Sequence, residues 1–369
     1  MTERRIVTIK IGSNSLVDEA GRLDRQFLAK IARQFAAIAK AGWQPVLVTS
    51  GAVAGGVARL GLKERPPGLP ERQALAAIGQ IGLVKLWEDA FAAVGLVAAQ
   101  VLLTHDDFSV RHRYLNLIAT FEALFTFGCV PVINENDTVA VEELSVGDND
   151  RLSALVATQL GAERLILLTD IDGVYDADPR TTPTARRLDT IPEVTAAMVA
   201  ATGGAGARGR GGMRSKLEAA RLASAAGVIT DICAARAEAA ITRVLSDEHV
   251  GTRVPARGAR ADSRRRWLAV ARRVHGAVTV DAGAAKALVE RGRSLLPAGI
   301  TSVEGRFARG DTIAIRSPDG DELARGLAGL SSDELTQIAG KRLDAAATLL
   351  GYALPKAAVH RDNMLMLAR

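Results

Sequence analysis

The chain of 369 residues has few of the features that mark an extracellular or membrane protein. Its two cysteines, Cys129 and Cys233, form no CxxC pair, which excludes a disulfide framework; both lie in apolar strand-like runs, so we expect buried thiols in a reducing compartment. No run of about 18 apolar residues occurs, which predicts no membrane span. The apolar stretch before Lys10 is too short for a secretory signal. Together these absences predict a cytoplasmic protein.

Several catalytic and nucleotide-binding motifs are also missing. The sequence has no GxxxxGK[ST] loop, and no GxGxxG follows a predicted strand. The tripeptide His360-Arg361-Asp362 resembles a protein-kinase catalytic loop, but Leu367 stands where that loop needs asparagine, and no DFG follows. What the chain does have is 48% hydrophobic residues, enough at this length for a sizeable core and two domains.

The net charge of +6 is concentrated in one segment. Residues 250–274 contain eight arginines and one aspartate, whereas residues 1–249 and 275–369 are close to neutral. An arginine-rich stretch with Gly, Ala and Pro is typical of a solvated linker, with a polyanion site as the alternative. We therefore expect a first domain at 1–255, a linker at 256–274 and a second domain, with a C-terminal tail, at 275–369.

Strand and helix patterns alternate in the first domain. Strands are predicted at 5–11, 45–49, 97–103, 129–133, 164–169 and 228–233, and helices at 27–41, 75–94, 115–127, 151–160 and 213–226. Repeated βα units of this length predict an α/β fold: an open, mostly parallel sheet sandwiched by helices. From Gly276 the runs become short and β-like, as at 277–280 and 312–316, which predicts a small β-rich domain.

Short polar side chains are densest in residues 130–154. A β-branched strand ends at Ile133 and leads into Asn134, Glu135, Asn136 and Asp137, and a second cluster at 147–150 precedes the helix expected from Arg151. In open α/β sheets, small ligands bind at the carboxyl edge of the strands, where such clusters lie. The alternative is a pair of Asx-rich turns with a helix N-cap.

Two lysines are candidate phosphate ligands. Lys10 ends the first strand and precedes the turn at 12–15, whose backbone N–H groups could wrap an anion. Lys216 follows a glycine-rich loop at 203–212 and lies where a helix begins. A surface lysine beside a flexible loop is the alternative for each. Thr169 and Asp170 open a polar turn after a strand and could border a nucleotide pocket.

Seven segments, in this order, resemble the amino acid kinase family and, within it, the members that phosphorylate glutamate. They are KIGSNSL (10–16), TSGAVAGG (49–56), RQALAAIGQ (72–80), VPVINENDTV (130–139), VGDNDRLSA (146–154), LLTDIDGVYDADPR (167–180) and GGMRSK (211–216). The likeness extends over the whole chain, because RGRSLLPAGI (291–300) and FARGDTIAI (307–315) resemble a PUA domain.

This resemblance implies ATP-dependent phosphorylation of the side-chain carboxylate of L-glutamate to L-glutamyl 5-phosphate, with Mg²⁺, as the first step of proline biosynthesis. It also implies inhibition by proline and a homo-oligomer, a dimer or a tetramer. Elementary chemistry agrees with the reaction, because the carboxylate, with a pKa of about 4.3, is already an ionised nucleophile at neutral pH and needs no general base. Phosphoryl transfer between anions then depends on positioning and on cations.

The resemblance also implies roles for single residues. Lys10 and Lys216 would neutralise the transferring phosphoryl group, with backbone N–H groups from Gly12 and its neighbours, and Asp150 would orient the two lysines. Glutamate would be held by Ser50, Asp137, Asn149 and Asn134, with Asp137 on its ammonium. ATP would border Lys10, Gly12, Thr169, Asp170, Gly211, Gly212, Met213, Arg214, Ser215 and Lys216. No residue is assigned as a metal ligand.

Two residues depart from the family pattern, and two alternative functions stay open. Arg210 stands where the family commonly has a small hydroxyl residue and could alter the affinity for ATP, while Ser215 replaces the usual threonine. The chain could instead be an amino acid kinase for aspartate, N-acetylglutamate, carbamate or UMP. It could also be an RNA-binding protein acting through the PUA-like domain, although the near-neutral charge of 275–369 argues against RNA binding.

Overall fold

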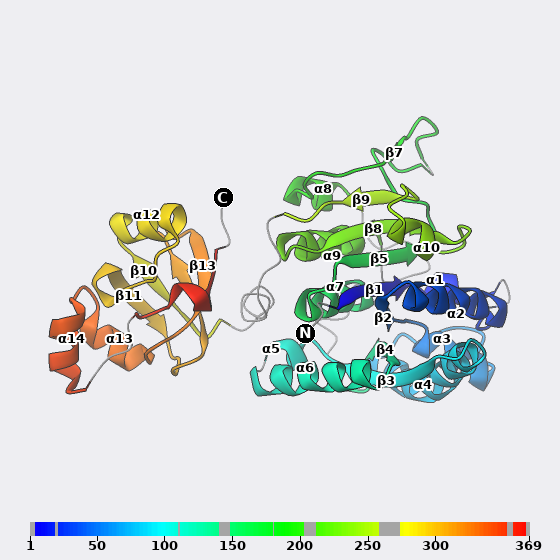
Figure 1. The fold of residues 1–369 in the computed structure, drawn as a ribbon, viewed down its shortest axis with the longest axis horizontal. Helices are drawn as coiled ribbons and strands as arrows, with labels where there is room; N and C mark the ends of the chain where they lie inside the picture. The colour runs from blue at the N-terminus through cyan, green and yellow to red at the C-terminus, as the bar shows by residue number, and fades with distance from the viewer. Residues whose placement is uncertain are drawn as a thin grey trace. The chain divides into compact units, whose positions relative to one another are not determined.

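The computed structural model describes residues 4–18, 21–109, 111–139, 148–179, 181–202, 212–257, 274–352 and 357–366. The chain forms two compact units, one of residues 1–107 with 111–260 and one of residues 108–110 with 261–369 (Figure 1). Most of the expected arginine-rich linker lies outside the described residues. No helix in the described part of the chain is long and apolar enough to cross a membrane.

The first unit is built on a seven-stranded sheet. Its strand order is β3 (Val97–Leu103), β4 (Cys129–Glu135), β2 (Trp43–Val48), β1 (Arg5–Ile11), β5 (Arg164–Thr169), β8 (Ile229–Ala234) and β9 (Thr252–Val254). Every neighbouring pair is parallel except β8 and β9, which are antiparallel. The predicted open, mostly parallel sheet is therefore confirmed.

Helices cover both faces of this sheet (Figure 1). α2 (Arg25–Lys40) contacts α4 (Leu69–Ala92) and α10 (Ala240–Leu245), whereas α7 (Asp148–Leu160) contacts α9 (Met213–Ala225) and α6 (Arg111–Thr126) packs on β4. In α2 the apolar positions 28, 31, 35 and 38 recur at helical spacing, and all four are buried. They form one core with Val7, Ile9 and Ile11 of β1 and with Trp87 and Phe91 of α4.

The polar stretch after β4 differs from the expectation at two points. β4 does not end at Ile133 but continues through Asn134 and Glu135, because the backbone still pairs with Leu102 and Leu103 of β3. α7 begins at Asp148, before the expected start at Arg151. Strand pairing uses backbone groups, so polar side chains can extend a strand where they face a cavity.

The short helix α3 (Ala52–Leu60) packs against α4 almost backbone to backbone. A Cβ atom at Gly79 would lie 1.9 Å from the carbonyl oxygen of Ala52, and one at Gly56 would lie 2.0 Å from that of Leu75. Only glycine permits this approach. The contact fixes where α3 begins, immediately after the end of β2.

Small elements complete the first unit, and the sequence patterns did not predict most of them. They are α1 (Ser13–Leu16), α8 (Ala196–Ala201) and a hairpin of β6 (Val174–Tyr175) and β7 (Arg187–Leu188). A further short helix, α5 (Asp106–Ser109), contains residues of both units. Both cysteines are free, as expected. Cys233 is buried, and burial raises the pKa of its thiol to about 12. The expectation of burial is wrong for Cys129, which is partly exposed at the start of β4.

The second unit has its own core around a five-stranded sheet, so the predicted β-rich domain is confirmed. The order is β11 (Ile300–Gly305), β10 (Gly276–Val280), β12 (Thr312–Arg316), β13 (Glu322–Leu327) and β14 (Met364–Met366). Only β10 and β12 are parallel. It also contains α12 (Ala282–Arg291), α13 (Ser332–Ile338), α14 (Leu343–Leu350) and two 3-10 turns at Pro297–Gly299 and Arg361–Asn363. The sequence patterns did not predict these helices.

Candidate functional site

A cavity of about 440 Å³ lies where the carboxyl ends of β1, β2, β4 and β5 meet. This is the edge of an open parallel sheet where ligands commonly bind. Its polar lining comes from each of these strand ends and from the helices that follow: Lys10, Ser13, Asn14, Ser15, Ser50, Arg65, Asn134, Glu135, Asp137, Asn149, Asp150, Thr169, Asp170 and Lys216. The structure thus brings the predicted residues Lys10, Gly12, Ser50, Asn134, Asp137, Asn149, Asp150, Thr169, Asp170 and Lys216 to one cavity.

Two lysines share one buried aspartate in this cavity. The Asp150 carboxylate is 1% exposed; its Oδ1 lies 2.6 Å from Lys10 Nζ, and its Oδ2 lies 3.4 Å from Lys216 Nζ. Ser215 donates its hydroxyl to the same Oδ2 at 2.6 Å. Lys10 is the penultimate residue of β1, Asp150 lies in the first turn of α7 and Lys216 in that of α9, so three separate elements meet here. The cluster carries two positive charges and one negative charge.

The pKa values of Lys10 and Asp150 are both lowered, and the sharing contributes to each change. Burial lowers the pKa of Lys10, and neighbouring Lys216 lowers it further, while Asp150 opposes both. Burial alone would raise the pKa of Asp150, but Lys10, Lys216 and the Ser215 hydroxyl outweigh it and bring the pKa to about 2. Two cations act on the one Asp150 carboxylate, whereas each lysine shares that carboxylate with the other lysine. The cluster is therefore suited to bind a further anion.

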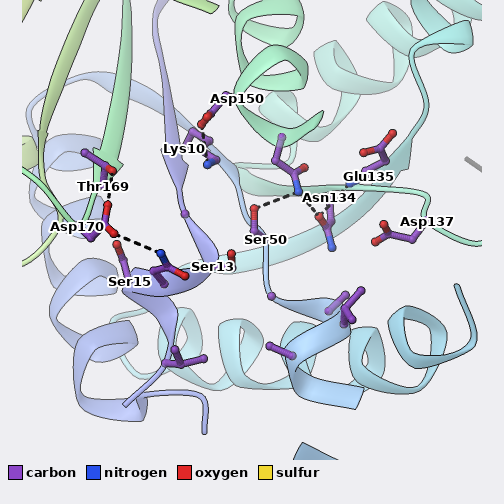
Figure 2. Close-up of a pocket in the computed structure, with 18 of the residues that line it drawn as sticks. Lys10, Ser13, Ser15, Ser50, Asn134, Glu135, Asp137, Asp150, Thr169 and Asp170 are labelled. Atoms are coloured by element: carbon purple, nitrogen blue, oxygen red, sulfur yellow. Dashed lines mark hydrogen bonds and ion pairs between the residues drawn. The ribbon is translucent and has the colours of Figure 1, made fainter. Parts of the chain in front are cut away.

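A second group of side chains forms a chain of hydrogen bonds. Asn149 donates from Nδ2 to Ser50 Oγ at 3.0 Å and to Asn134 Oδ1 at 3.1 Å. Asn134 donates from its own Nδ2 to Gln80 Oε1 at 2.8 Å. In Figure 2, Lys10 and Asp150 lie between this group, with Glu135 and Asp137, and the Thr169–Asp170 pair. The cavity therefore has two chemically different ends with the lysines between them.

The other end of the cavity is centred on Asp170. Its Oδ2 accepts from Asn14 Nδ2 at 3.2 Å, and its Oδ1 accepts from Thr169 Oγ1 at 2.9 Å. Partial burial raises the pKa of Asp170, but these two hydrogen bonds reverse the effect and leave it below the usual value. Asp170 is thus an exposed, ionised carboxylate in a fixed orientation.

The glycine residues predicted to hold phosphate need one correction. The N–H of Gly12 donates to the carbonyl oxygen of Leu168 at 3.2 Å, so it is engaged with the neighbouring strand β5. The first N–H groups of α1, which begins at Ser13, follow directly and have no partner inside the helix. Gly212 caps α9, whereas Gly211 and Arg210 lie outside the described residues.

Three residues of the predicted ATP loop, Met213, Arg214 and Ser215, are not among the described residues that line the cavity. Ser215 instead turns inward to Asp150, and Arg214 pairs with Glu218 at 3.1 Å on the surface. Sequence reasoning also missed Asn14 and Gln80. Both fall inside family-like segments, but nothing in their spacing distinguishes them from surface amides. Among the described residues, no group of three or more His, Cys, Asp or Glu could hold a metal ion.

Comparisons with known proteins show the family of the chain. The amino acid kinase family model matches residues 5–234, and the PUA domain model matches residues 276–349. Glutamate 5-kinase from Thermus thermophilus is 46% identical over 364 residues, which cover 99% of this chain and 97% of the relative. Glutamate 5-kinase from Deinococcus radiodurans is 46% identical over 362 residues, which cover 98% of this chain and 99% of the relative.

A solved structure adds evidence on the fold alone. Carbamate kinase from Giardia lamblia bound to AMP-PNP is similar with a TM-score of 0.50 and 19% identity, covering 70% of this chain and all of that chain. At this identity the likeness does not extend to the substrate.

Proposed function

The chain belongs to the amino acid kinase family and, within it, to the glutamate 5-kinases, and we propose that its cavity transfers the γ-phosphoryl group of ATP to the side-chain carboxylate of L-glutamate. The reaction is the first step of proline biosynthesis. The observation that supports this use of the cavity is the cluster in which Lys10 and Lys216 share Asp150.

The lysine cluster carries the electrostatic part of the mechanism. A carboxylate oxygen of glutamate attacks the γ-phosphorus, and the bond from that phosphorus to the bridging oxygen breaks as its electron pair passes to ADP. Negative charge gathers on the transferring group, and preorganised cations in a dry site stabilise it best. Lys10 and Lys216 are about 95% buried and share the Asp150 carboxylate between them, so two cationic side chains with one shared carboxylate would face this group. Asp150 holds them in place.

Glutamate would occupy the end of the cavity that contains Ser50, Asn134, Asp137 and Asn149. The amide and hydroxyl groups there are fixed by mutual hydrogen bonds, which favours recognition of a polar amino acid. The Asp137 carboxylate would take the α-ammonium. A substrate placed there has its side-chain carboxylate directed toward the lysines, between the two ends of the cavity.

ATP would occupy the end that contains Thr169 and Asp170. We propose that Mg²⁺ arrives with it, and the donors present fit this ion. Mg²⁺ commonly uses one or two protein carboxylates together with substrate phosphates, so a cluster of three acidic residues is not required. Asp170 is the ionised carboxylate suited to hold it, because Asp150 is enclosed by its lysines. Bound Mg²⁺ would neutralise phosphate charge.

Three further expectations remain proposals. Proline carries the same α-carboxylate and α-amino nitrogen as glutamate, so it would inhibit by competing at the glutamate end of the cavity. A homo-oligomer, dimer or tetramer, is expected from the family, and so is a cytoplasmic location. Raising proline should increase the apparent KM for glutamate without changing kcat; a fall in kcat at unchanged KM would argue against competition.

A hydroxylamine trap tests the reaction. Purified protein is given ATP, Mg²⁺ and, in turn, L-glutamate, L-aspartate or N-acetyl-L-glutamate, and any acyl phosphate is converted to its hydroxamate. We expect hydroxamate from L-glutamate alone. Hydroxamate from another acceptor in its place would contradict the proposed substrate, and none from any acceptor by folded, ATP-binding protein would contradict the reaction.

A further inference from the structure

We propose that Gln80, which is not among the described residues lining the cavity, is a positioning residue. It fixes the direction of a hydrogen-bond chain so that the Ser50 hydroxyl donates to a carboxylate of the amino-acid substrate. The inference rests on the proposed function. It adds the role of Gln80, the direction of the hydrogen bonds, and the carboxylate of the substrate as the group that Ser50 binds.

Two groups hold the hydrogen-bond chain in one direction, the backbone N–H of Glu135 and the side chain of Gln80. The N–H of Glu135 lies 2.9 Å from the Asn134 side chain, and a backbone N–H can only donate. The atom of Asn134 that faces it is therefore the oxygen, Oδ1. The amide nitrogen of Asn134 must then point the other way, toward an acceptor. Gln80 supplies that acceptor, its Oε1 at 2.8 Å.

The same logic fixes the next two members. Because Asn134 Oδ1 only accepts, the atom of Asn149 that lies 3.1 Å from it is the nitrogen, Nδ2. The second hydrogen of Nδ2 goes to Ser50 Oγ at 3.0 Å. Ser50 therefore accepts from Asn149 and cannot donate to it. Figure 2 labels Ser50 and Asn134, and dashed lines mark hydrogen bonds at both side chains.

The Ser50 hydroxyl, at the end of this chain of hydrogen bonds, is the group that would contact the substrate. A serine hydroxyl has one hydrogen, and that of Ser50 has no acceptor among the described residues, while Ser50 itself lines the cavity. Its hydrogen is available to the cavity, where it can serve an acceptor but not another donor. Glutamate offers carboxylate oxygens as acceptors, and hydrogen bonds to a carboxylate are among the strong ones.

Gln80 is needed because a side-chain amide can rotate and exchange the positions of its oxygen and nitrogen. Without an acceptor at position 80, Asn134 Nδ2 would lose its partner, and a buried amide donor without a partner is costly. The Asn134 amide would then be held by the Glu135 N–H alone, so the oxygen that Asn149 donates to, and with it the Ser50 hydroxyl, would be held less firmly in its direction. Gln80 thus acts through Asn134 and Asn149 and not by touching the substrate.

Glutamate binding in a set of variants tests the proposal. The dissociation constants of L-glutamate and of ADP are measured by calorimetry for the native protein, Gln80→Leu, Gln80→Glu, Ser50→Ala and the double variant Gln80→Leu/Ser50→Ala. Gln80→Glu keeps an acceptor oxygen whether or not its carboxyl is protonated. Gln26→Leu, the same substitution at an exposed position of α2, is the matched control.

We expect glutamate binding to weaken about tenfold in Ser50→Ala and about fivefold or more in Gln80→Leu. Gln80→Glu and Gln26→Leu should stay within about twofold of native. The double variant should match Ser50→Ala within about twofold, because both changes remove the same hydrogen bond. ADP binding should stay within about twofold throughout.

The proposal would be overturned by unchanged glutamate binding in Gln80→Leu, by effects that multiply fully in the double variant, or by equal weakening of ADP binding. If Gln80→Leu does not fold, Gln80→Met removes the oxygen at similar length and gives the same comparison. Failure of the proposed function is separate, since it would appear as absence of hydroxamate from glutamate with the native protein.

Discussion

Replacing Asp150 by asparagine should destabilise the first unit by several kcal/mol at neutral pH. The asparagine oxygen can serve one lysine, but its NH₂ group would face the other ammonium. One of the two buried cations then loses the Asp150 oxygen that it contacts, and removing one partner of a buried pair costs about 3–5 kcal/mol. The lowered pKa gives a smaller figure of the same sign: a fall from 3.8 to about 2 corresponds to about 2 kcal/mol, at about 1.4 kcal/mol per pKa unit.

The sign of the pH dependence is also fixed. A carboxyl whose folded pKa is depressed stabilises the fold above its unfolded pKa of 3.8 and loses that effect as the pH falls through about 2. The difference between native protein and Asp150→Asn should therefore be constant from pH 7 to about pH 4 and shrink below it. Urea unfolding, followed by the fluorescence of buried Trp87, measures the difference.

Asp170→Asn is the matched control, because Asp170 is an exposed carboxylate in the same cavity that accepts hydrogen bonds from Asn14 and Thr169. It should change the free energy of unfolding by less than about 1 kcal/mol. If Asp150→Asn were as stable as the native protein at pH 7, or no less stable than Asp170→Asn, the lysines would not depend on Asp150 and the reasoning would be refuted.

Two further predictions follow from the same cavity. Gly79→Ala forces α3 away from α4, because its Cβ would lie 1.9 Å from the Ala52 carbonyl oxygen, and the KM for glutamate should rise about tenfold or more. Gly82→Ala is the control, because no atom lies within 4 Å of its Cβ, and it should leave the KM unchanged. Equal KM values for both variants would contradict the helix contact. Burial lowers the pKa of Lys10, so its charge is lost at a lower pH than in a free lysine. Because ADP has no group that titrates between about pH 8 and 10.5, the affinity for ADP should fall with an apparent pKa below 10.5. Constant affinity up to that pH would contradict this role of Lys10.

The sheet of the first unit was readable from the sequence because its inner strands, such as β1 and β5, are mostly apolar runs that are buried almost throughout. The predicted spans 5–11, 97–103 and 164–169 coincide with β1, β3 and β5. Polar side chains misled the prediction at β4, which runs to Glu135 since backbone pairing with β3 continues. The small helices of the second unit, such as α13, are too short for a clear helical period.

The site was accessible from the sequence only in part. Lys10, Asp150 and Lys216 were assigned together through family-like segments, while the two-to-one sharing, which contributes to the lowered pKa values of Lys10 and Asp150, depends on distances no spacing encodes. The engagement of the Gly12 N–H by Leu168 is likewise a consequence of strand pairing. Gln80 is separated from Asn134 by 54 positions, and its role follows from which atom of each amide faces the next.

The most direct test of the account is an oxygen-transfer measurement. L-glutamate labelled with ¹⁸O in its side-chain carboxylate is incubated with the protein, ATP and Mg²⁺. L-Glutamyl 5-phosphate closes into a ring by attack of its own α-amine and releases inorganic phosphate that keeps the oxygen bridging carbon and phosphorus. The account predicts one ¹⁸O atom in each phosphate released. Phosphate without the label would show that water, and not the glutamate carboxylate, attacks ATP, and would contradict the central claim.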